Sequence, residues 1–273
     1  MPELPEVETI ARALRASVVG KQVAEVRLSG LPLRRPVAAD FAAGLKGRTI
    51  TGIERRGKYL ILEVEPHGYC IIHLGMSGRL LHCPPRSRRT RHTHAVIRFL
   101  DQTELHYRDH RRFGLLALYN APHQDGIPEL RRLGKDPLSA GFTIRWLWPL
   151  LREGRREVKS FLLDQRQIAG LGNIYACEAL FLAGIHPARR CGRISRVRGA
   201  RMVRAVRRVV RDAILHRGTT FSDFMDSDGQ TGDHQSYLRV YHRQGKPCYR
   251  CGCTIRRLIQ GNRSTFYCPH CQR

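Results

Sequence analysis

The first residues of the chain combine two groups that can carry out covalent chemistry on an aldehyde. Once Met1 is removed, the ring nitrogen of Pro2 is a free secondary amine beside the carboxylic acid of Glu3. Such an amine can attack an aldehydic carbon and form a charged iminium, an electron sink of the Schiff-base type. The same start also suits a helix cap, because Pro5 and Glu6 fit the first helical turn. The residues alone are therefore compatible with a nucleophile, with a cap, or with both.

A second group of reactive side chains lies at the other end of the sequence. Cys248 and Cys251 form one Cys-x2-Cys pair, Cys268 and Cys271 form another, and sixteen residues separate them. Two pairs at this spacing are typical of a tetrahedral four-thiolate zinc site, which has no open position and is therefore structural. Two disulfides are the alternative, which an intracellular setting disfavours. We expect one structural Zn²⁺, and Cys253 follows Cys251 too closely to belong to it.

The charge of the chain indicates a polyanionic partner. Its 273 residues include 48 Lys and Arg against 23 Asp and Glu, a formal net charge of +25. This imbalance points first to nucleic acid and second to an anionic membrane. No apolar run reaches the roughly 18 residues of a spanning helix, and the acidic N-terminus is unlike a signal peptide. We therefore expect an intracellular protein that binds nucleic acid and has no membrane segment.

Two hydrophobic patterns divide the chain. Residues 5–15 have the spacing of one helix face. Short strand-like runs follow at 23–28, 59–64, 69–74, 95–100 and 104–107. Short strands at regular spacing indicate a β-sandwich or barrel. Beyond about residue 134 the pattern becomes helical, and helices are expected at 158–164, 173–183 and 199–216. The expected fold class is therefore α+β, with the strands preceding most of the helices.

Six short motifs, spread over the whole chain, belong to one pattern. They are Pro2–Thr9, Lys58–Leu60, His73–Gly78, Arg111–Gly114, Gly170–Tyr175 and Arg263–Cys268. In this order, and with the spacing of the cysteine pairs, they resemble the bacterial formamidopyrimidine-DNA glycosylases of the Fpg/Nei superfamily. Enzymes of this family remove oxidised purines, including 8-oxoguanine and formamidopyrimidines, in base excision repair. The related endonuclease VIII enzymes usually have glycine where this chain has Leu4.

The resemblance implies a division into three parts. Residues 1–130 are expected to form a catalytic domain with an N-terminal helix and a β-sandwich. Residues 131–236 are expected to form a helix–two-turn–helix DNA-binding domain with a damaged-base loop, and residues 237–273 a zinc-finger β-hairpin. The resemblance further implies a monomer that binds double-stranded DNA containing a damaged base, located in the bacterial cytoplasm and associated with the nucleoid through DNA.

The resemblance also implies a bifunctional glycosylase and abasic-site lyase. Pro2 is expected to attack the sugar C1′ and displace the damaged base, while Glu3 moves protons around the sugar. β,δ-Elimination then nicks the strand, with proton donation assigned to Lys58 and then to Arg263. A guanidinium is a poor acid, since its pKa lies above ~12, so Arg263 is expected mainly to hold a phosphate. For Lys58, proton donation and phosphate binding both stay open.

An enzyme that acts on a base takes it out of the stack and leaves a hole. By resemblance, Met76, Arg111 and Phe113 fill it, because a thioether and an aromatic ring can stack on bases while a guanidinium can bond the orphaned cytosine. Core packing is the alternative for Met76 and Phe113. Phosphate contacts are expected from His73, His92, Lys159 and Asn173, with Arg155 or its neighbour Arg156 as a further candidate. The glycine-rich turn before Asn173 is a candidate anion cradle at a helix start.

Three places depart from the usual pattern of this family. His110 stands where a small residue or proline is common, residues 232–234 lack an aromatic pair, and His242 replaces a common glycine. They bear on lesion preference, since residues 217–236 resemble the damaged-base loop. Two alternatives stay open: an oxidised-pyrimidine glycosylase of the endonuclease VIII type, and a non-catalytic zinc-containing DNA-binding protein.

Overall fold

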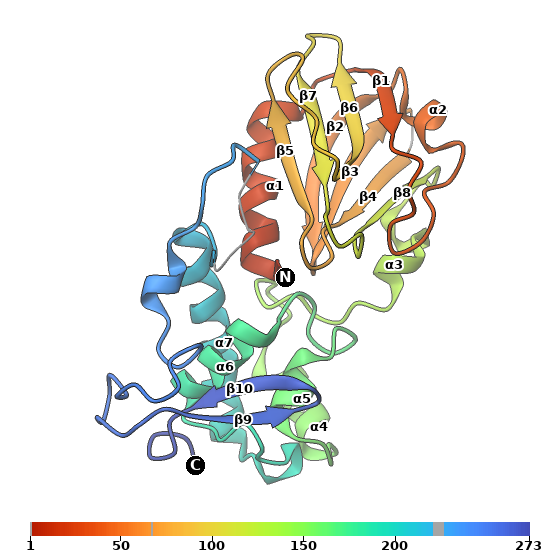
Figure 1. The fold of residues 1–273 in the computed structure, drawn as a ribbon. Coiled ribbons are helices and arrows are strands. Elements are labelled where there is room, and N and C mark those ends of the chain that lie inside the picture. Colours follow the sequence, from red (N-terminus) through yellow and green to blue (C-terminus); the bar gives the residue numbers. More distant parts are fainter. Residues whose placement is uncertain (1, 67, 221–226) are drawn as a thin grey trace. The chain divides into compact units, whose positions relative to one another are not determined.

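The computed structural model describes residues 2–66, 68–220 and 227–273. The chain forms two compact units (Figure 1). Unit 1 contains Met1–Arg131 and His216–Asp233, and unit 2 contains Arg132–Leu215 and His234–Arg273. The segment that follows the longest helix therefore packs with the N-terminal part of the chain. The three-part division expected from the resemblance stays a prediction.

Unit 1 is a sandwich of two antiparallel sheets with a helix, α1 (Leu4–Val18), packed against them. One sheet has the order β1 (Val23–Leu28), β6 (Thr93–Phe99), β7 (Glu104–Arg108) and β5 (Arg79–Cys83). The other has the order β2 (Thr49–Arg56), β3 (Tyr59–Glu65), β4 (Gly68–His73) and β8 (Leu115–Tyr119). Short helices α2 (Phe41–Leu45) and α3 (Pro128–Arg131) and a 3₁₀ turn, η1 (Gln124–Gly126), complete it. The expected β-sandwich is confirmed.

The core of unit 1 follows from the periodicities of its elements. On α1, the apolar side chains of Val7, Ile10, Leu14 and Val18 recur at helical spacing and are fully buried. On β3, Leu60, Leu62 and Val64 alternate onto the same core, as the pleat of a strand requires. Burying each such aliphatic side chain contributes roughly 1.5–3 kcal/mol. The core therefore fixes α1 against the sandwich along its whole length.

Unit 2 consists of helices followed by a two-stranded hairpin. The helices are α4 (Ile144–Arg152), α5 (Val158–Leu163), α6 (Asn173–Ala183) and α7 (Arg196–Leu215), with 3₁₀ turns η2 (Cys191–Arg193) and η3 (His234–Tyr237). The hairpin pairs β9 (Arg256–Gln260) with β10 (Arg263–Tyr267). Gly261 and Asn262 connect these strands and both have positive φ, as a tight two-residue hairpin loop requires. Helix α6 is the central element, packed against α5, α7 and β10.

The structure confirms the helices expected at the N-terminus and in the second half, together with five strands. It adds the strands β2, β5 and β8 and the helices α2, α3 and α4, for which the sequence pattern gave no expectation. In β2 the reason is visible, because the register shifts between Ile50 and Gly52. Because of this bulge, the two buried residues of β2 are Ile50 and Ile53, which are three positions apart instead of two. The alternation that indicates a strand is therefore broken.

Among the described residues, none of the helices combines the length and the apolar character needed to cross a membrane.

Candidate active site and DNA-binding residues

The N-terminal turn of α1 holds Pro2 and Glu3 in a buried setting. A capping box joins Glu3 to Glu6, and the Glu3 N–H donates to Glu6 Oε2 at 2.8 Å. The second oxygen of Glu6, Oε1, accepts the backbone N–H of Thr219 at 2.8 Å. One buried carboxylate therefore fixes both the start of the helix and the segment after α7. The cap and the nucleophile interpretations of this start are compatible, since the cap sets the position of the residue next to Pro2.

An ion pair between Glu8 and Arg55 connects α1 to the turn that carries Lys58. Arg55 Nε donates to Glu8 Oε2 at 2.8 Å, and a terminal nitrogen of Arg55 donates to the Gly57 carbonyl at 3.2 Å. Burial acts to raise the pKa of Glu8, but the hydrogen bonds and charges of Arg55 and Arg12 outweigh it and hold that pKa below its ordinary value. Lys58 itself is buried, with 7% exposed. The pair therefore positions the Lys58 turn relative to the helix that begins with Pro2.

His73 ends β4 as a neutral imidazole. Burial lowers its pKa to about 3, and the positive charges of Arg34 and Lys58 act in the same direction. Its Nδ1 accepts the backbone N–H of Gly75 at 2.9 Å. The ring proton is therefore on Nε2, which makes this nitrogen a donor suited to a phosphate oxygen. Tyr59, which follows Lys58, pairs with His73 across β3 and β4, so the two predicted site residues are close.

The three residues predicted to fill the hole of a flipped base stand out from two turns of unit 1. Met76 is 41% and Phe113 45% exposed, which excludes the core-packing alternative for both. The guanidinium of Arg111 lies over the Phe113 ring, 4.8 Å from its centroid. Exposed large apolar side chains of this kind mark interaction sites when they cluster.

Asp109 holds these two turns together, and sequence reasoning did not find it. Its fully buried carboxylate accepts from Ser77 Oγ at 2.6 Å, and from the backbone N–H groups of Arg111 and Gly114 at 3.3 and 2.9 Å. The turns also interlock at Gly75, where an added Cβ would lie 2.5 Å from the backbone of Phe113. The only signal in the sequence is an acid directly after a strand and before the exposed motif.

His92, the other histidine predicted to contact phosphate, belongs to the same region of unit 1. Its carbonyl accepts the N–H of Asp109 at 2.9 Å, and its ring lies edge-on to His110, with centroids 6.2 Å apart. Burial lowers the pKa of His92, and the charge of Arg91 adds to this effect. His110, which departs from the family pattern, therefore places a second imidazole beside a predicted phosphate contact.

In unit 2, the predicted residues gather on the zinc hairpin. Asn173, at the start of α6, donates through Nδ2 to the Ser264 carbonyl at 2.9 Å. This bond fixes the residue that follows Arg263, whose own side chain is exposed at the start of β10. Asn173 Oδ1 is buried and has no hydrogen-bond partner among the described residues. Asn173 therefore anchors the hairpin through its amide N–H and keeps one acceptor unused.

Lys159 and Arg155 have different settings although both are predicted to contact phosphate. Lys159 is 1% exposed, and its ammonium donates to Thr265 Oγ1 on β10 at 2.7 Å. This geometry supports an anchor for the hairpin. Arg155 is exposed, whereas its neighbour Arg156 is paired with Asp164 at 2.9 Å. Arg155 is therefore the better placed of the two neighbours for a phosphate.

A buried carboxylate also fixes the chain that leads into the zinc finger. Glu178 on α6 accepts the backbone N–H groups of Arg239, Val240 and Tyr241 at 2.8–2.9 Å. Burial raises its pKa, although the three hydrogen bonds act in the opposite direction. The segment 239–241 thus takes its position from α6, the same helix whose first residue holds β10.

The four paired cysteines converge as the sequence predicts. The sulfur atoms of Cys248, Cys251, Cys268 and Cys271 all lie within 4.8 Å of one another. Two Sγ–Sγ distances are 3.5 Å, between Cys251 and Cys268, and 4.0 Å, between Cys248 and Cys271. Both are close to the ~3.8 Å edge of a tetrahedron with Zn–S bonds of about 2.3 Å. They are far too long for disulfides. The four thiolates therefore fit one structural zinc, which would tie the two ends of the hairpin together.

Backbone groups prepare these sulfurs for a metal. The N–H of Arg250 points to Cys248 Sγ and the N–H of Cys271 to Cys268 Sγ, each at 3.4 Å. Burial raises the pKa of Cys248, but the N–H groups of Arg250 and Cys251 outweigh it and lower that pKa to about 7. The first Cys-x2-Cys knuckle thus favours a thiolate at Cys248. In the second knuckle, burial and the neighbouring sulfurs raise the pKa of Cys268 and of Cys271.

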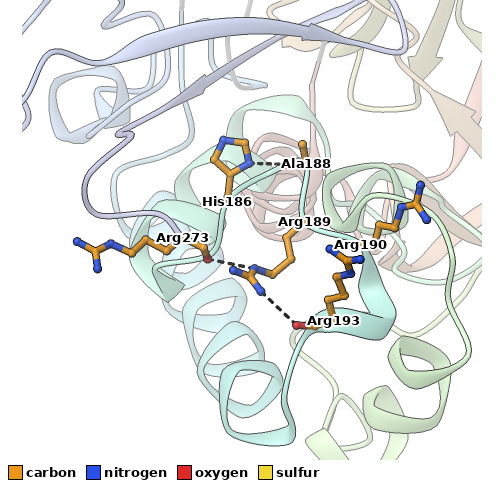
Figure 2. A pocket seen from close by; sticks show the side chains of 6 residues that line it. All are labelled: His186, Ala188, Arg189, Arg190, Arg193 and Arg273. Carbon is orange, nitrogen blue, oxygen red and sulfur yellow. Dashed lines mark hydrogen bonds between the residues drawn. The ribbon is translucent and has the colours of Figure 1, made fainter.

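A basic pocket of about 650 Å³ lies beyond the C-terminal end of α6 (Figure 2). It is lined by His186, Ala188, Arg189, Arg190, Arg193 and Arg273. Arg189 is held by two backbone carbonyls, those of Arg273 and Arg193, at 3.2 and 3.3 Å. Four arginines line it, and none of the described lining residues is acidic, so the pocket suits an anion. Since the eleven residues of α6 span about 16 Å, this pocket is separate from the predicted cradle at Asn173.

Three family models match consecutive parts of the chain. The formamidopyrimidine-DNA glycosylase N-terminal domain matches residues 1–116, the H2TH domain of the same enzymes matches residues 133–225, and a zinc finger found in FPG and IleRS matches residues 245–273. The sandwich, the helical unit and the four-cysteine hairpin thus define a DNA glycosylase class with helix–two-turn–helix and zinc-finger elements.

Whole proteins match as well. The chain is 42% identical to the formamidopyrimidine-DNA glycosylase of Pelotomaculum thermopropionicum, covering 100% of this chain and 99% of that protein. It is 44% identical to that of Methylococcus capsulatus, covering 100% of both. A solved structure of MutM (Fpg) from Thermus thermophilus has a TM-score of 0.89 at 38% identity, covering 99% of this chain and 98% of that one. The chain belongs to the formamidopyrimidine-DNA glycosylases.

Two further solved structures contain DNA. A point mutant of the Lactococcus lactis FPG, in complex with Fapy-dG containing DNA, has a TM-score of 0.92 at 32% identity over 100% of both chains. The same organism's Fpg in complex with abasic-site DNA has a TM-score of 0.91 at 32% identity over 99% of both chains.

Proposed function

We propose that this protein is a DNA glycosylase and abasic-site lyase of base excision repair that excises oxidised purines from duplex DNA. The observation that carries the proposal is the setting of Pro2. It precedes a helix whose cap is fixed by Glu6 and whose next turn, through Glu8 and Arg55, positions Lys58. The amine and the carboxyl group are thereby held at the start of one helix, and Arg55 links the turn that carries the ammonium to the same helix. Relatives of the same length that bind Fapy-dG and abasic DNA support this substrate class.

The first chemical stage is base removal. The Pro2 nitrogen, as a neutral amine, forms a bond to the sugar C1′, and the bond from C1′ to the damaged base breaks with its electron pair going to the base. The proton of the new ammonium passes to the departing base, and the protonated carboxyl group of Glu3 gives its proton to O4′ as the C1′–O4′ bond opens. The product is an iminium between Pro2 and the opened sugar, which is the electron sink that later steps need.

The second stage is strand cleavage. The iminium acidifies the C2′ proton, and its removal expels the 3′ phosphate; a second elimination expels the 5′ phosphate. Water then releases the sugar remnant and restores Pro2. We assign Lys58 and Arg263 to these leaving phosphates. Arg263 acts by charge and hydrogen bonds, since a guanidinium keeps its proton.

Further residues hold the DNA in this proposal. Met76, Arg111 and Phe113 fill the hole left by the flipped nucleotide, and their exposure supports this role. His73, His92, Arg155 and Asn173 contact phosphates, while Lys159 acts through the hairpin it anchors. The structural zinc supplies no chemistry and holds the hairpin that carries Arg263. We further propose that the protein works as a monomer on double-stranded DNA in the cytoplasm.

Borohydride trapping tests the proposal directly. The enzyme is incubated with a duplex containing 8-oxoguanine opposite cytosine, and sodium borohydride reduces the iminium to a stable covalent adduct. We expect the wild type and the exposed-loop control Pro85→Gly to form the adduct, and protein whose Pro2 nitrogen has been acetylated to form none, because an amide nitrogen cannot form an iminium. Equal trapping by the acetylated protein would reject the N-terminal nucleophile.

The same assay separates the lesion classes. A Lactococcus lactis Fpg structure contains DNA with an oxidised pyrimidine, so a matched duplex carrying an oxidised pyrimidine is the appropriate competitor. We expect faster single-turnover excision of 8-oxoguanine. Faster excision of the pyrimidine would favour the endonuclease VIII-type alternative, and absence of any nick would favour a binding protein.

A further inference from the structure

We propose a second metal site beside the structural zinc, formed by Cys251, Cys253 and His270 and specific for soft divalent ions such as Zn²⁺ or Cd²⁺. One ligand atom from each of these residues lies within 4.8 Å of the other two. Cys251 is also a member of the four-thiolate set. The two sites therefore share one sulfur, which bridges the two ions. Thiolate and imidazole ligands select soft and borderline metals.

The six donor residues become more exposed to solvent from the four-thiolate site toward the second site. Cys248 and Cys268 are buried, with 3% and 0% exposed, while Cys251 is only partly buried. Cys253 and His270 are exposed. The shared sulfur thus lies at the boundary, with Cys268 Sγ 3.5 Å away on the buried side and the two extra donors on the surface side. The second site is open to solvent, whereas the first is closed.

The two extra donors are held by the backbone of the knuckles. Gly252 has φ +74°, and its N–H donates to the Cys248 carbonyl at 2.9 Å. The Cys253 carbonyl in turn accepts the Cys248 N–H at 2.9 Å. His270 lies in the other knuckle, between Cys268 and Cys271. Both donors therefore occupy fixed backbone positions before any second ion arrives, which lowers the entropic cost of binding.

Charge and coordination favour a second ion. Zn²⁺ with four thiolates carries a net charge of −2, so the shared sulfur keeps strong donor character. A second Zn²⁺ that takes the Cys253 thiolate and the neutral His270 ring brings the cluster to −1. One proton is released from the Cys253 thiol in this step, as metal binding to a thiol requires. Three protein ligands leave a fourth position for water, which is the pattern of an open zinc site.

Metal stoichiometry of the full-length protein tests the site. The protein is dialysed against zinc buffered by a chelator over a range of free concentrations, and bound zinc is counted by elemental analysis. We expect the wild type to rise from one to two zinc ions per chain. Cys253→Ser and His270→Ala should stay at one under the same conditions. Cys83→Ser and His123→Ala remove a thiol and an imidazole elsewhere, and should still reach two.

A spectroscopic readout locates the second ion. In protein loaded with ¹¹³Cd²⁺, we expect two resonances, one from four sulfur donors and one at higher field from the mixed sulfur and nitrogen set. Cys253→Ser should lose only the second resonance. The proposal is overturned if the wild type saturates at one ion, if the substitutions leave two bound, or if Cys253→Ser loses the first ion. None of these readouts depends on catalytic activity.

Discussion

Single buried side chains set the position of the reactive groups in this protein. Glu6 accepts from the backbone of Glu3 and of Thr219, and Asp109 accepts from both turns that carry the exposed Met76 and Phe113. Each is a carboxylate that satisfies backbone N–H groups in a buried setting, where leaving one unpaired costs about 1–3 kcal/mol. The residues that we assign to chemistry and to DNA binding are thus positioned by buried carboxylates whose oxygens bond to the protein backbone.

Glu6→Gln tests this positioning role. The amide keeps one acceptor oxygen, so one of the two bonds, to Glu3 or to Thr219, is lost. Because misplacement by about 1 Å can cost 10²-fold in rate, we expect the single-turnover rate to fall by about 10–100-fold with little change in KM for DNA. Glu153→Gln, at an exposed position, should leave the rate unchanged. A rise in KM alone would argue against positioning of the nucleophile.

His73 makes unit 1 sensitive to acid. Its pKa is about 3 in the folded protein and about 6.5 in an unfolded chain. Between these values the unfolded state binds a proton that the folded state does not, so stability is complete above about pH 6.5 and is lost as the pH falls. From pH 7 to pH 5, the free energy of unfolding falls in the wild type partly because of His73. In His73→Gln we expect this fall to be smaller by about 2 kcal/mol.

Urea unfolding at a series of pH values measures this difference. His123→Gln, at an exposed histidine of the same unit, should follow the wild-type pH dependence. Identical slopes for His73→Gln and the wild type would mean that the ring is charged in the folded protein.

At the scale of elements, α6 organises unit 2. Its first residue, Asn173, holds β10, and Glu178 in its middle holds the backbone of residues 239–241. Lys159 on α5 adds a third bond, to Thr265. The hairpin that carries Arg263 is therefore fixed by the helices as well as by the zinc site. The helices hold it through hydrogen bonds from Asn173 and Lys159.

Glu178→Ala should release the segment that leads into the zinc finger. It leaves three backbone N–H groups without their acceptor, and we expect unit 2 to lose about 2–4 kcal/mol of stability. Hydrogen exchange should show the loss first at residues 239–241. Glu153→Ala serves as the exposed control. Unchanged exchange at 239–241 would show that the zinc site alone fixes the hairpin.

The sequence predicted those elements whose periodicity is regular, and the zinc site, whose ligands are close in sequence. It did not predict β2, because the bulge at Ile50 breaks the alternation. It did not identify Asp109 either, since its three bonds join turns from different strands. The phosphate contact expected of Lys159 stays a prediction: only its charge is visible in the sequence, whereas its burial depends on how the hairpin folds over α5. The spacing of residues in the sequence predicts sites whose residues are close in sequence. Contacts between residues far apart in the sequence produce no such pattern.

For the whole molecule, the net charge of +25 makes electrostatics a large part of DNA affinity. Each phosphate that a cation neutralises contributes about −0.9 to the slope of log K against log salt on duplex DNA. Arginine is abundant, however, and α7 alone exposes Arg201, Arg204, Arg208 and Arg211. Charge by itself therefore does not distinguish a DNA contact from a solvated helix face.

Salt series on single variants make that distinction. We expect Arg155→Ala to weaken DNA binding and to reduce the magnitude of the slope by about 1. Arg204→Ala on the solvated face of α7 should leave the slope unchanged, although it removes the same charge. Equal effects of the two substitutions would show that α7 also lies along the DNA backbone. Filter binding at 50–300 mM salt, on the order of the physiological range, measures both.

The division of the chain into units limits how this architecture can be recombined. Unit 1 includes His216–Asp233, which the chain supplies only after passing through α7. A fragment that stops at residue 131 lacks Thr219, so Glu6 loses one of its two backbone donors. Replacing everything after residue 131 with another DNA-binding domain would therefore also remove part of the support of Pro2. The chain after residue 131 is therefore not an exchangeable domain. An engineered chimera must keep His216–Asp233 to keep the proposed nucleophile in place.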